Sequence, residues 1–253
     1  MRFSAFRKTG KNISGMNDWY DTVLGQRLLD ELQEKLQSVM AVSFGYYALQ
    51  LGCATQAPKI LDSCRVRHHF YADSDGLGKF QTHKEMLAVA SDSVDLVIIM
   101  HEISALKEPH AFLREVSRIL IPQGKLIVID FNPFSLWGLR HFFQSWLEII
   151  PWHRHFFTAR RLTDWMKLLG FERQRHLKVG YFLPSQRLAG LSWLNWIEKA
   201  LKNWFGFAAA LNVLVYDKNI ASITPVRYRW MTRKFLAGKV ARPSVGRDMK
   251  YDR

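Results

Sequence analysis

The hydrophobic pattern is clearest in the middle of the chain, where it outlines three consecutive elements. Val94–Met100 is a short, mostly apolar run rich in branched side chains, which is typical of a strand buried on both faces. From Pro109 to Leu120, apolar residues recur at helical spacing and form one face. Pro122–Gly124 indicates a turn, and Leu126–Ile129 is a second buried strand. This order predicts a strand–helix–strand unit, and therefore a parallel sheet with right-handed crossovers.

Similar patterns surround this unit. The predicted helices cover 17–41, 57–63, 141–150, 158–169 and 191–205, and the predicted strands cover 44–51, 66–72, 171–183 and 211–216, with a short strand starting at 80. Residues 130–138, which include Asn-Pro and a glycine, are typical of a loop. Because helices alternate with strands, we expect an α/β fold: a Rossmann-like, doubly wound, mostly parallel sheet with an N-terminal helix.

The formal net charge of +14 is concentrated at the two ends of the chain. Residues 1–12 hold four basic and no acidic side chains, and residues 227–253 hold nine basic and two acidic ones. We therefore divide the chain into a basic N-terminal arm, 1–16, a globular domain, 17–226, and the basic tail, 227–253. The tail suits an anionic partner, either RNA or a membrane surface. The alternative is a solvated, disordered segment that only aids solubility.

Cysteine and histidine usage argues against a disulfide framework and against a metal site. Cys53 and Cys64 are the only cysteines, and their spacing matches neither a metal-ligand motif nor a disulfide framework. A reducing, cytoplasmic compartment is therefore expected. The closely spaced histidines match no metal-ligand motif. No secretory signal follows the basic N-terminus, and the longest uncharged apolar run, 205–216, is too short to span a bilayer. Peripheral attachment to the inner membrane is the alternative location.

A candidate ligand site follows the first predicted strand. In a doubly wound sheet, ligands bind beyond the carboxyl ends of the strands, where the strand order reverses. The loop Gln50–Gln56 contains Gly52, which permits a tight turn and a close approach of backbone to a ligand. Asp73 lies 21 residues after Gly52, a spacing that suits the ribose hydroxyls of an adenosine ligand. Ordinary strand-to-helix turns also use such residues, so the motif is weak by itself.

Several longer motifs carry more information. The central ones are Asp92–Val97, His101, Glu108–His110, Leu113–Leu120 and Pro122–Gly124. A second set comprises Trp19, Leu24–Gly25, Phe44–Tyr46, Leu49–Gly52, Phe131–Pro133, Gly138–Arg140 and Thr224–Arg227. With the central set, the chain resembles the class I S-adenosylmethionine-dependent methyltransferases of the type 11 branch, over roughly residues 19–225. The second set is similar to a little-characterised proteobacterial subgroup.

The resemblance implies S-adenosylmethionine as the cofactor and assigns residues to it. The implied contacts are Gly52, Cys53 and Ala54 with its methionine part, Asp73 with its ribose, Thr82 and His83 with its adenine, and Met100, His101 and Glu102 as the pocket wall after the next strand. No protein nucleophile is required, because the sulfonium already carries an activated methyl group. His101 would be a general base for an acceptor that must lose a proton, or a pocket residue that fixes the loop.

The cofactor loop departs from the family pattern. Gln50 stands where the family has an acidic residue, and Ala54 and Gln56 stand at later glycine positions. His83 replaces an aspartate beside the adenine. The missing carboxylate at Gln50 removes the expected partner of the cofactor's ammonium group, a charged hydrogen bond that contributes about 1.5–3 kcal/mol. Its loss would weaken binding about ten- to a hundredfold.

These features predict methyl transfer to a small or lipid-like acceptor. Tryptophans downstream of the cofactor half are most simply part of an ordinary core, and the alternative is an apolar acceptor pocket or an interfacial lid. One alternative is a catalytically inactive binding protein that keeps the fold, and another is an RNA methyltransferase guided by the basic tail. The RNA alternative lacks the aromatic-basic interleaving of single-strand binders. Asn132–Phe134 only superficially resembles the motif of base-methylating enzymes.

Overall fold

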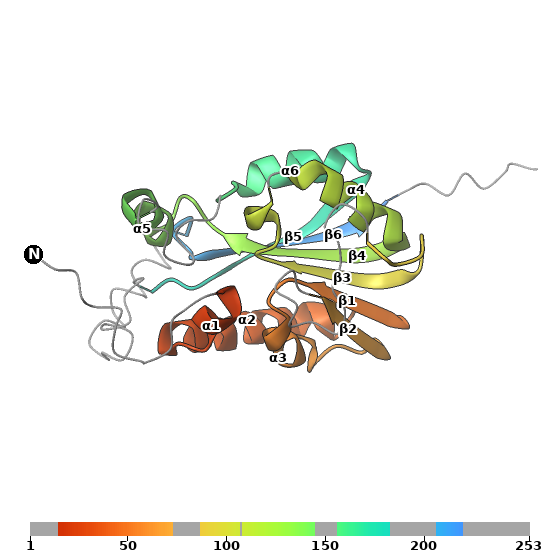
Figure 1. Ribbon diagram of the computed structural model, residues 1–253, viewed down its shortest axis with the longest axis horizontal. Helices are drawn as coiled ribbons and strands as arrows, with labels where there is room; N and C mark the ends of the chain where they lie inside the picture. The colour runs from red at the N-terminus through yellow and green to blue at the C-terminus, as the bar shows by residue number, and fades with distance from the viewer. Residues whose placement is uncertain (1–14, 73–86, 107, 145–155, 183–205, 220–253) are drawn as a thin grey trace, which may run out of the picture. The chain divides into compact units, whose positions relative to one another are not determined.

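The structure of the protein is a computed structural model that describes residues 15–72, 87–106, 108–144, 156–182 and 206–219 (Figure 1). All of these residues belong to one unit, Met1–Ile220. Several predicted segments lie outside the described residues: the basic arm before residue 15, the strand starting at 80, the end of the helix 141–150, the helix 191–205 and the basic tail 227–253.

A six-stranded sheet forms the centre of the fold, with the strand order β2-β1-β3-β4-β6-β5. The strands are β1 (Tyr47–Leu51), β2 (His68–Ala72), β3 (Val94–Met100), β4 (Leu120–Phe131), β5 (Phe171–Val179) and β6 (Leu211–Lys218). The strand β1 pairs in parallel with β2 and β3, and β3 pairs in parallel with β4. The strand β6 is antiparallel to both β4 and β5. The predicted doubly wound, mostly parallel sheet is confirmed, and its order reverses between β1 and β3.

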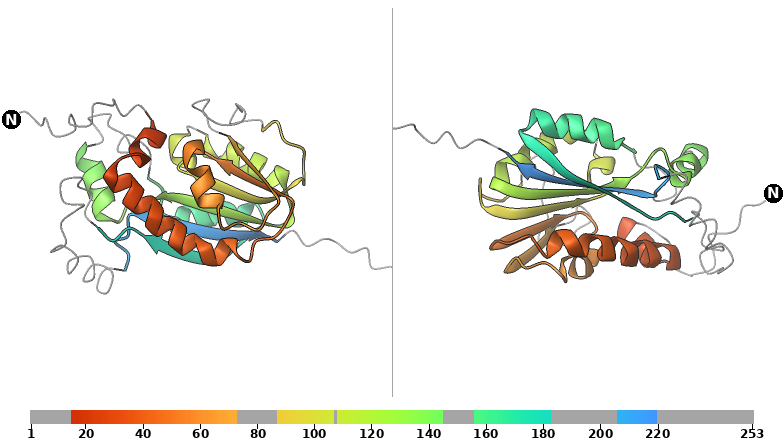
Figure 2. Two further views of the ribbon diagram at one scale, coloured as in Figure 1. Left: turned by 90° about the horizontal axis from the view of Figure 1, so that it is seen from below. Right: turned by 180° about the vertical axis from the view of Figure 1, so that it is seen from behind.

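Helices cover both faces of this sheet. They are α1 (Met16–Tyr20), α2 (Val23–Met40), α3 (Ala57–Leu61), α4 (Pro109–Ile119), α5 (Leu136–Gln144) and α6 (Ala159–Leu168), with short 3₁₀ turns η1 (Ala54–Gln56) and η2 (Ile103–Ala105). Figures 1 and 2 show α1, α2 and α3 on one face and α4 and α6 on the other. Within the described residues, no helix is both long and apolar enough to cross a bilayer.

The strand–helix–strand unit at the centre of the sequence is confirmed. Pro109 occupies the first turn of α4, where its missing N–H costs no hydrogen bond. Phe112, Leu113 and Val116 are fully buried from α4 against the sheet. Burial of each such side chain contributes about 1.5–3 kcal/mol. The middle of the sheet therefore follows directly from the hydrophobic pattern.

The predicted single helix over 17–41 is wrong, because Thr22 separates α1 from α2. The Oγ1 atom of Thr22 accepts a hydrogen bond from the Gly25 amide at 3.2 Å, which caps α2. The same hydroxyl donates to the Trp19 carbonyl oxygen at 2.8 Å. These two bonds stabilise a bend, so α1 leaves the axis of α2.

Other boundaries differ from the predicted ones. The strand predicted over 44–51 is the shorter β1, and the turn predicted at Pro122–Gly124 lies inside β4. Gln123 has a φ of 65°, and the register with β3 shifts nearby, so the chain bends without leaving the sheet. The helix α5 begins at Leu136, inside the predicted loop 130–138. The remaining described elements occupy their predicted positions.

Gly25 sets the distance between the two N-terminal helices. A Cβ atom at this position would overlap the Trp19 carbonyl oxygen and lie 2.6 Å from the Tyr20 Cα atom. Since backbone atoms cannot move aside cheaply, only glycine lets α1 fold back onto the first turn of α2.

We predict that Gly25→Ala destabilises the protein, although alanine is ordinarily the better helix former by about 1 kcal/mol. The overlap with α1 should lower the free energy of unfolding by about 1–3 kcal/mol, measured by urea denaturation. Ser38→Ala, an exposed change on the same helix, should alter it by less than about 0.5 kcal/mol. A stability gain in Gly25→Ala would show that α1 does not pack at this distance.

Candidate active site

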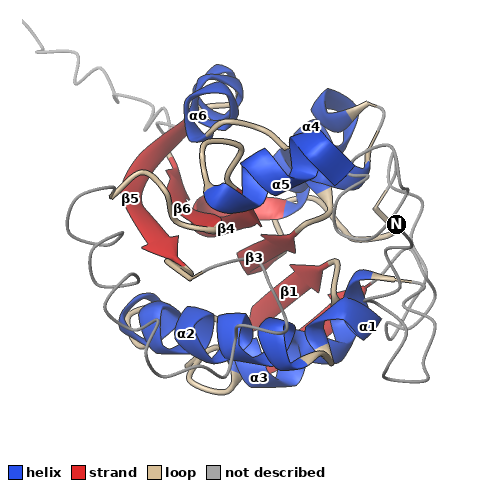
Figure 3. Ribbon diagram, turned by 90° about the vertical axis from the view of Figure 1, so that its left-hand side faces the viewer, coloured by secondary structure: helices blue, strands red, loops and turns tan. Residues whose placement is uncertain are grey.

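Loops from neighbouring strands meet at the carboxyl edge of the sheet, where the strand order reverses (Figure 3). Gly52 and Cys53 follow β1, and His101 and Glu102 follow β3, which pairs with β1. Asp130 lies one residue before the end of β4, the next strand in the sheet. The ends of three neighbouring strands therefore meet at the place where doubly wound sheets bind their ligands.

Gly52 allows the ends of β1 and β3 to approach closely. Its φ is 82°, a conformation that favours glycine. A Cβ atom there would overlap the Met100 carbonyl oxygen and lie 3.0 Å from Glu102 Oε2. Cys53, the next residue, also has a positive φ, of 48°. The turn after β1 is therefore tight and lies against the first residues after β3.

The amide of Gln50 is turned toward this loop. Its Nε2 atom donates to the carbonyl oxygens of Gly52 and Cys53, each at 3.2 Å, and lies 3.9 Å from Met100 Sδ. The side chain is fully buried, and its Oε1 atom has no hydrogen-bond partner in the described part of the chain. The two loop carbonyls thus face the strand end and need a donor there, which an amide supplies and a carboxylate does not.

His101 is buried between three neighbours. Its Nε2 atom lies 2.7 Å from the Tyr20 hydroxyl, and its Nδ1 atom lies 3.5 Å from Asp130 Oδ1. The imidazole stacks on the Phe131 ring with centroids 4.4 Å apart. The backbone of His101 has a φ of 55°, and Ser104 Oγ donates to its carbonyl oxygen at 2.9 Å. The ring is therefore held on both nitrogens and on one face.

The hydrogen-bond roles of His101 follow from its two polar neighbours, Tyr20 and Asp130. Burial, with the nearby Cys53 and Asp130 adding to it, raises the pKa of Tyr20 well above its ordinary value of 10.0. The hydroxyl therefore keeps its proton at neutral pH. A carboxylate only accepts, so the Nδ1 atom that faces Asp130 carries the proton of the neutral ring, and the Nε2 atom accepts from the Tyr20 hydroxyl. Within the described residues, Asp130 Oδ2 has no hydrogen-bond partner.

The helix α1 closes this site, and sequence reasoning missed its role. Asn17 Oδ1 accepts from the Thr55 amide at 3.3 Å and from the Thr55 hydroxyl at 2.7 Å, which fixes α1 on η1. Trp19 packs edge-on against Phe131 with ring centroids 5.9 Å apart. Tyr20 then reaches His101. No local pattern indicates this contact, because the two residues are 81 positions apart in the sequence.

Asn132 organises the loop between β4 and α5. Its Nδ2 atom donates to the carbonyl oxygens of Phe207 and Ala209, at 2.6 and 3.0 Å, and its Oδ1 atom accepts from the Phe134 amide at 3.1 Å. Both ends of the Asn132 side-chain amide are therefore bonded to backbone groups of the protein and are not directed to a ligand. We conclude that the similarity of this segment to a base-methylating motif is coincidental.

The structure gathers most of the residues that the sequence assigns to the cofactor. Those at the carboxyl edge are Gly52, Cys53, Ala54, Met100, His101 and Glu102, and those outside the described residues are Asp73, Thr82 and His83. The edge also contains Tyr20, Gln50 and Asp130, none of which was assigned to cofactor binding or catalysis. Ligand binding by all of these residues stays a prediction.

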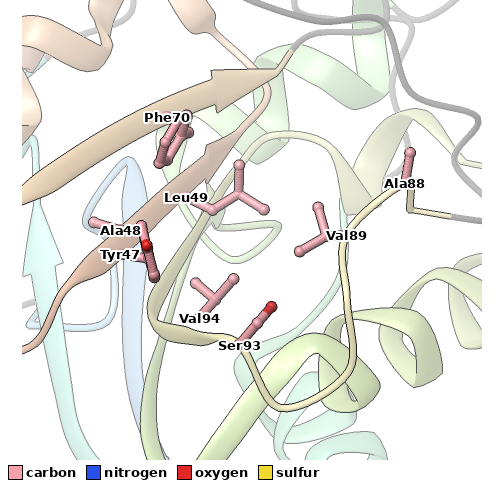
Figure 4. Close-up of a pocket in the computed structure, with 8 residues that line it drawn as sticks. All are labelled: Tyr47, Ala48, Leu49, Phe70, Ala88, Val89, Ser93 and Val94. Carbon is pink, nitrogen blue, oxygen red and sulfur yellow. The ribbon is translucent and has the colours of Figure 1, made fainter.

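An apolar groove lies elsewhere on the sheet (Figure 4). It is lined by Tyr47, Ala48, Leu49, Phe70, Ala88, Val89, Ser93 and Val94. Tyr47 and Val94 are the first residues of β1 and β3, so the groove reaches the amino ends of these strands, away from His101. Across the described ranges, no three or more His, Cys, Asp or Glu side chains are grouped to hold a metal ion.

Comparison with known proteins assigns the chain to a family. A family model described as a methyltransferase domain matches residues 29–176, which is more than half of the chain. The uncharacterized protein YafS of Escherichia coli (strain K12) is 30% identical over 173 residues, covering 68% of this chain and 71% of that protein.

Solved structures agree on the fold. An S-adenosylmethionine-dependent methyltransferase of Thermotoga maritima, described as a possible histamine N-methyltransferase, aligns with a TM-score of 0.58 and 16% identity, over 79% of this chain and 93% of that chain. A chain from the Haloferax volcanii complex of a methyltransferase with its activator Trm112 aligns with a TM-score of 0.57 and 17% identity, over 80% and 95%.

These matches confirm the class that the sequence predicts, while the type 11 branch within it stays a prediction. S-adenosylmethionine is the cofactor of such enzymes, as expected from the sequence. The chain belongs to the methyltransferase domain family and has the class I S-adenosylmethionine-dependent methyltransferase fold.

Proposed function

We propose that the protein transfers a methyl group from S-adenosylmethionine to an acceptor that loses a proton in the reaction. The observation that carries this proposal is the buried His101, whose ring nitrogens face Asp130 and Tyr20 at the edge where the strand order reverses. A histidine held in one tautomer at the ligand end of such a sheet suits a general base.

The residues at this edge fit a cofactor with a cationic amino-acid end. Gln50 Oε1 is a buried acceptor that lacks a hydrogen-bond partner in the described structure, and Glu102 is a buried carboxylate beside Gly52. An ammonium group carries three donors and requires such acceptors. In this proposal the cofactor contacts are Gly52, Cys53, Ala54, Met100, His101 and Glu102, with Asp73 on the ribose and Thr82 and His83 beside the adenine.

The bound cofactor supplies a methyl group that is already activated, so the protein has to position the acceptor and accept its proton. Asp130 holds the His101 ring through Nδ1, and Phe131 stacks on one face, which leaves Nε2 as the basic atom. The Tyr20 hydroxyl occupies Nε2 at 2.7 Å, so in this proposal the Tyr20 oxygen takes the proton of the acceptor while its own proton passes to His101 Nε2.

The small or lipid-like acceptor is proposed from the sequence alone. Trp19, Phe131 and Trp137 pack together with ring centroids 5.7–5.9 Å apart, and Tyr20 joins them, but all four are fully buried, so Trp137 belongs to the core and not to an open acceptor pocket. An RNA acceptor guided by the basic tail, peripheral membrane attachment and a non-catalytic binding protein stay predictions from the sequence, and nothing among the described residues favours them over the small acceptor.

Cofactor binding is the first test. We predict that calorimetric titration with S-adenosylhomocysteine gives a dissociation constant of about 100 μM or tighter, which corresponds to about −5.5 kcal/mol. Gln50 stands where the family has an acidic residue, so we expect weaker cofactor binding than in family members that keep that residue. Absence of heat at about 1 mM ligand would refute the proposed function.

The second test concerns His101. His101→Asn keeps a residue that tolerates the left-handed backbone but removes the base. We predict that it slows incorporation of tritium from methyl-labelled S-adenosylmethionine into small-molecule and lipid fractions of a cell extract by about 10²–10⁴-fold. His110→Asn, the same change at an exposed position of α4, should leave the rate unchanged. Equal rates in His101→Asn and wild type would exclude His101 as the base.

A third test concerns the loop itself. Gln50→Glu restores the family's acidic residue, yet we predict that it destabilises the protein, because a carboxylate would then face two carbonyl oxygens that now accept from Nε2. The free energy of unfolding at neutral pH should fall by about 1–3 kcal/mol in urea denaturation. The matched change Gln37→Glu, exposed on α2, should alter it by less than about 0.5 kcal/mol. Unchanged stability in Gln50→Glu would mean that the loop carbonyls do not face this side chain.

A further inference from the structure

We propose that Glu102 binds the ammonium group of the cofactor's amino-acid end, in place of the acidic residue that β1 lacks. This inference rests on the proposed function and names the side chain that would recognise one part of the ligand. It moves the negative charge of the site from the end of β1 to the end of β3, across the point where the strand order reverses.

The end of β1 offers no charge to an ammonium group. Gln50 is neutral, and its Nε2 donor is used on the Gly52 and Cys53 carbonyls. Its free Oε1 atom can accept one hydrogen bond, but without the strength of a charge-assisted pair. A cationic ligand at this edge therefore needs a carboxylate from another element.

Glu102 is placed to supply it. Its Oε2 atom lies 3.0 Å from the point that a Cβ atom on Gly52 would occupy, so its carboxylate covers the glycine turn. The side chain belongs to a residue that is only 6% exposed. The turn η2 fixes its backbone, since the Ala105 amide donates to the Glu102 carbonyl oxygen at 3.1 Å. The carboxylate thus lies directly against the glycine turn.

The second buried carboxylate at this edge has a different task. Among the described residues, Glu102 and Asp130 are the only buried carboxylates. Asp130 Oδ1 accepts from the Phe131 amide at 2.9 Å and faces His101 Nδ1. Asp130 faces the base and Glu102 faces the glycine turn, so Glu102 is the buried carboxylate that we place beside the amino-acid end of the ligand.

The test compares two ligands that differ in the group that Glu102 would bind. S-adenosylhomocysteine carries the ammonium group, whereas 5′-methylthioadenosine lacks the whole amino-acid end. By calorimetry, Glu102→Gln should weaken the binding of S-adenosylhomocysteine about ten- to a hundredfold, through loss of a charge-assisted contact. Its affinity for 5′-methylthioadenosine should stay within about twofold of the wild-type value. Glu108→Gln, an exposed control just before α4, should change neither affinity.

Three outcomes would overturn the inference or its basis. If Glu102→Gln binds S-adenosylhomocysteine as tightly as the wild type, Glu102 does not bind the ammonium group. If both ligands weaken equally while thermal unfolding without ligand is unchanged, the residue shapes the pocket and does not recognise that group. If the wild-type protein binds neither ligand, the proposed function fails, a result distinct from the other two.

Discussion

The close approach of β1 and β3 at their carboxyl ends is the constraint on which the rest of the site depends. Gly52 has no side chain, so its backbone lies against the Met100 carbonyl oxygen, and a Cβ atom would force the strands apart. This contact places the residues after β1 beside those after β3. It also determines what Gln50 can do, because the tight turn directs two carbonyl oxygens back toward its amide.

A second layer of the site comes from the N-terminal helix. Thr22 ends the turn between α1 and α2, and Gly25 lets α1 fold back closely, so that Tyr20 reaches His101. The pKa of Tyr20 is raised by burial, which keeps the hydroxyl protonated beside His101. Features that look purely structural in α2 therefore position a hydrogen-bond partner of the candidate base.

The two walls of the site are consequently different in character. The wall after β3 keeps the residues that the family resemblance leads one to expect, and it carries the charge at Glu102. The wall after β1 departs from the family at Gln50, and its loop has adapted, with an amide donor serving carbonyls where a carboxylate would be repelled. Glutamine at position 50 is therefore compatible with the fold. Function then depends on which other residue supplies the negative charge for the ammonium group of the cofactor.

The sequence by itself determined the sheet, the central strand–helix–strand unit and the glycine turn, because hydrophobic periodicity and turn residues act over a few neighbouring positions. It also named His101 and Glu102 as candidates, through the family motifs next to a buried strand, and their roles stay predictions. It missed the break at Thr22, the direction of the Gln50 amide, and the contact of Tyr20 with His101. The break at Thr22 is a local cap that a continuous apolar stripe concealed, and the direction of the Gln50 amide depends on the left-handed turn at Gly52 and Cys53, which hydrophobic pattern does not report. Only the tertiary structure decided the contact of Tyr20 with His101, because it joins residues 81 positions apart.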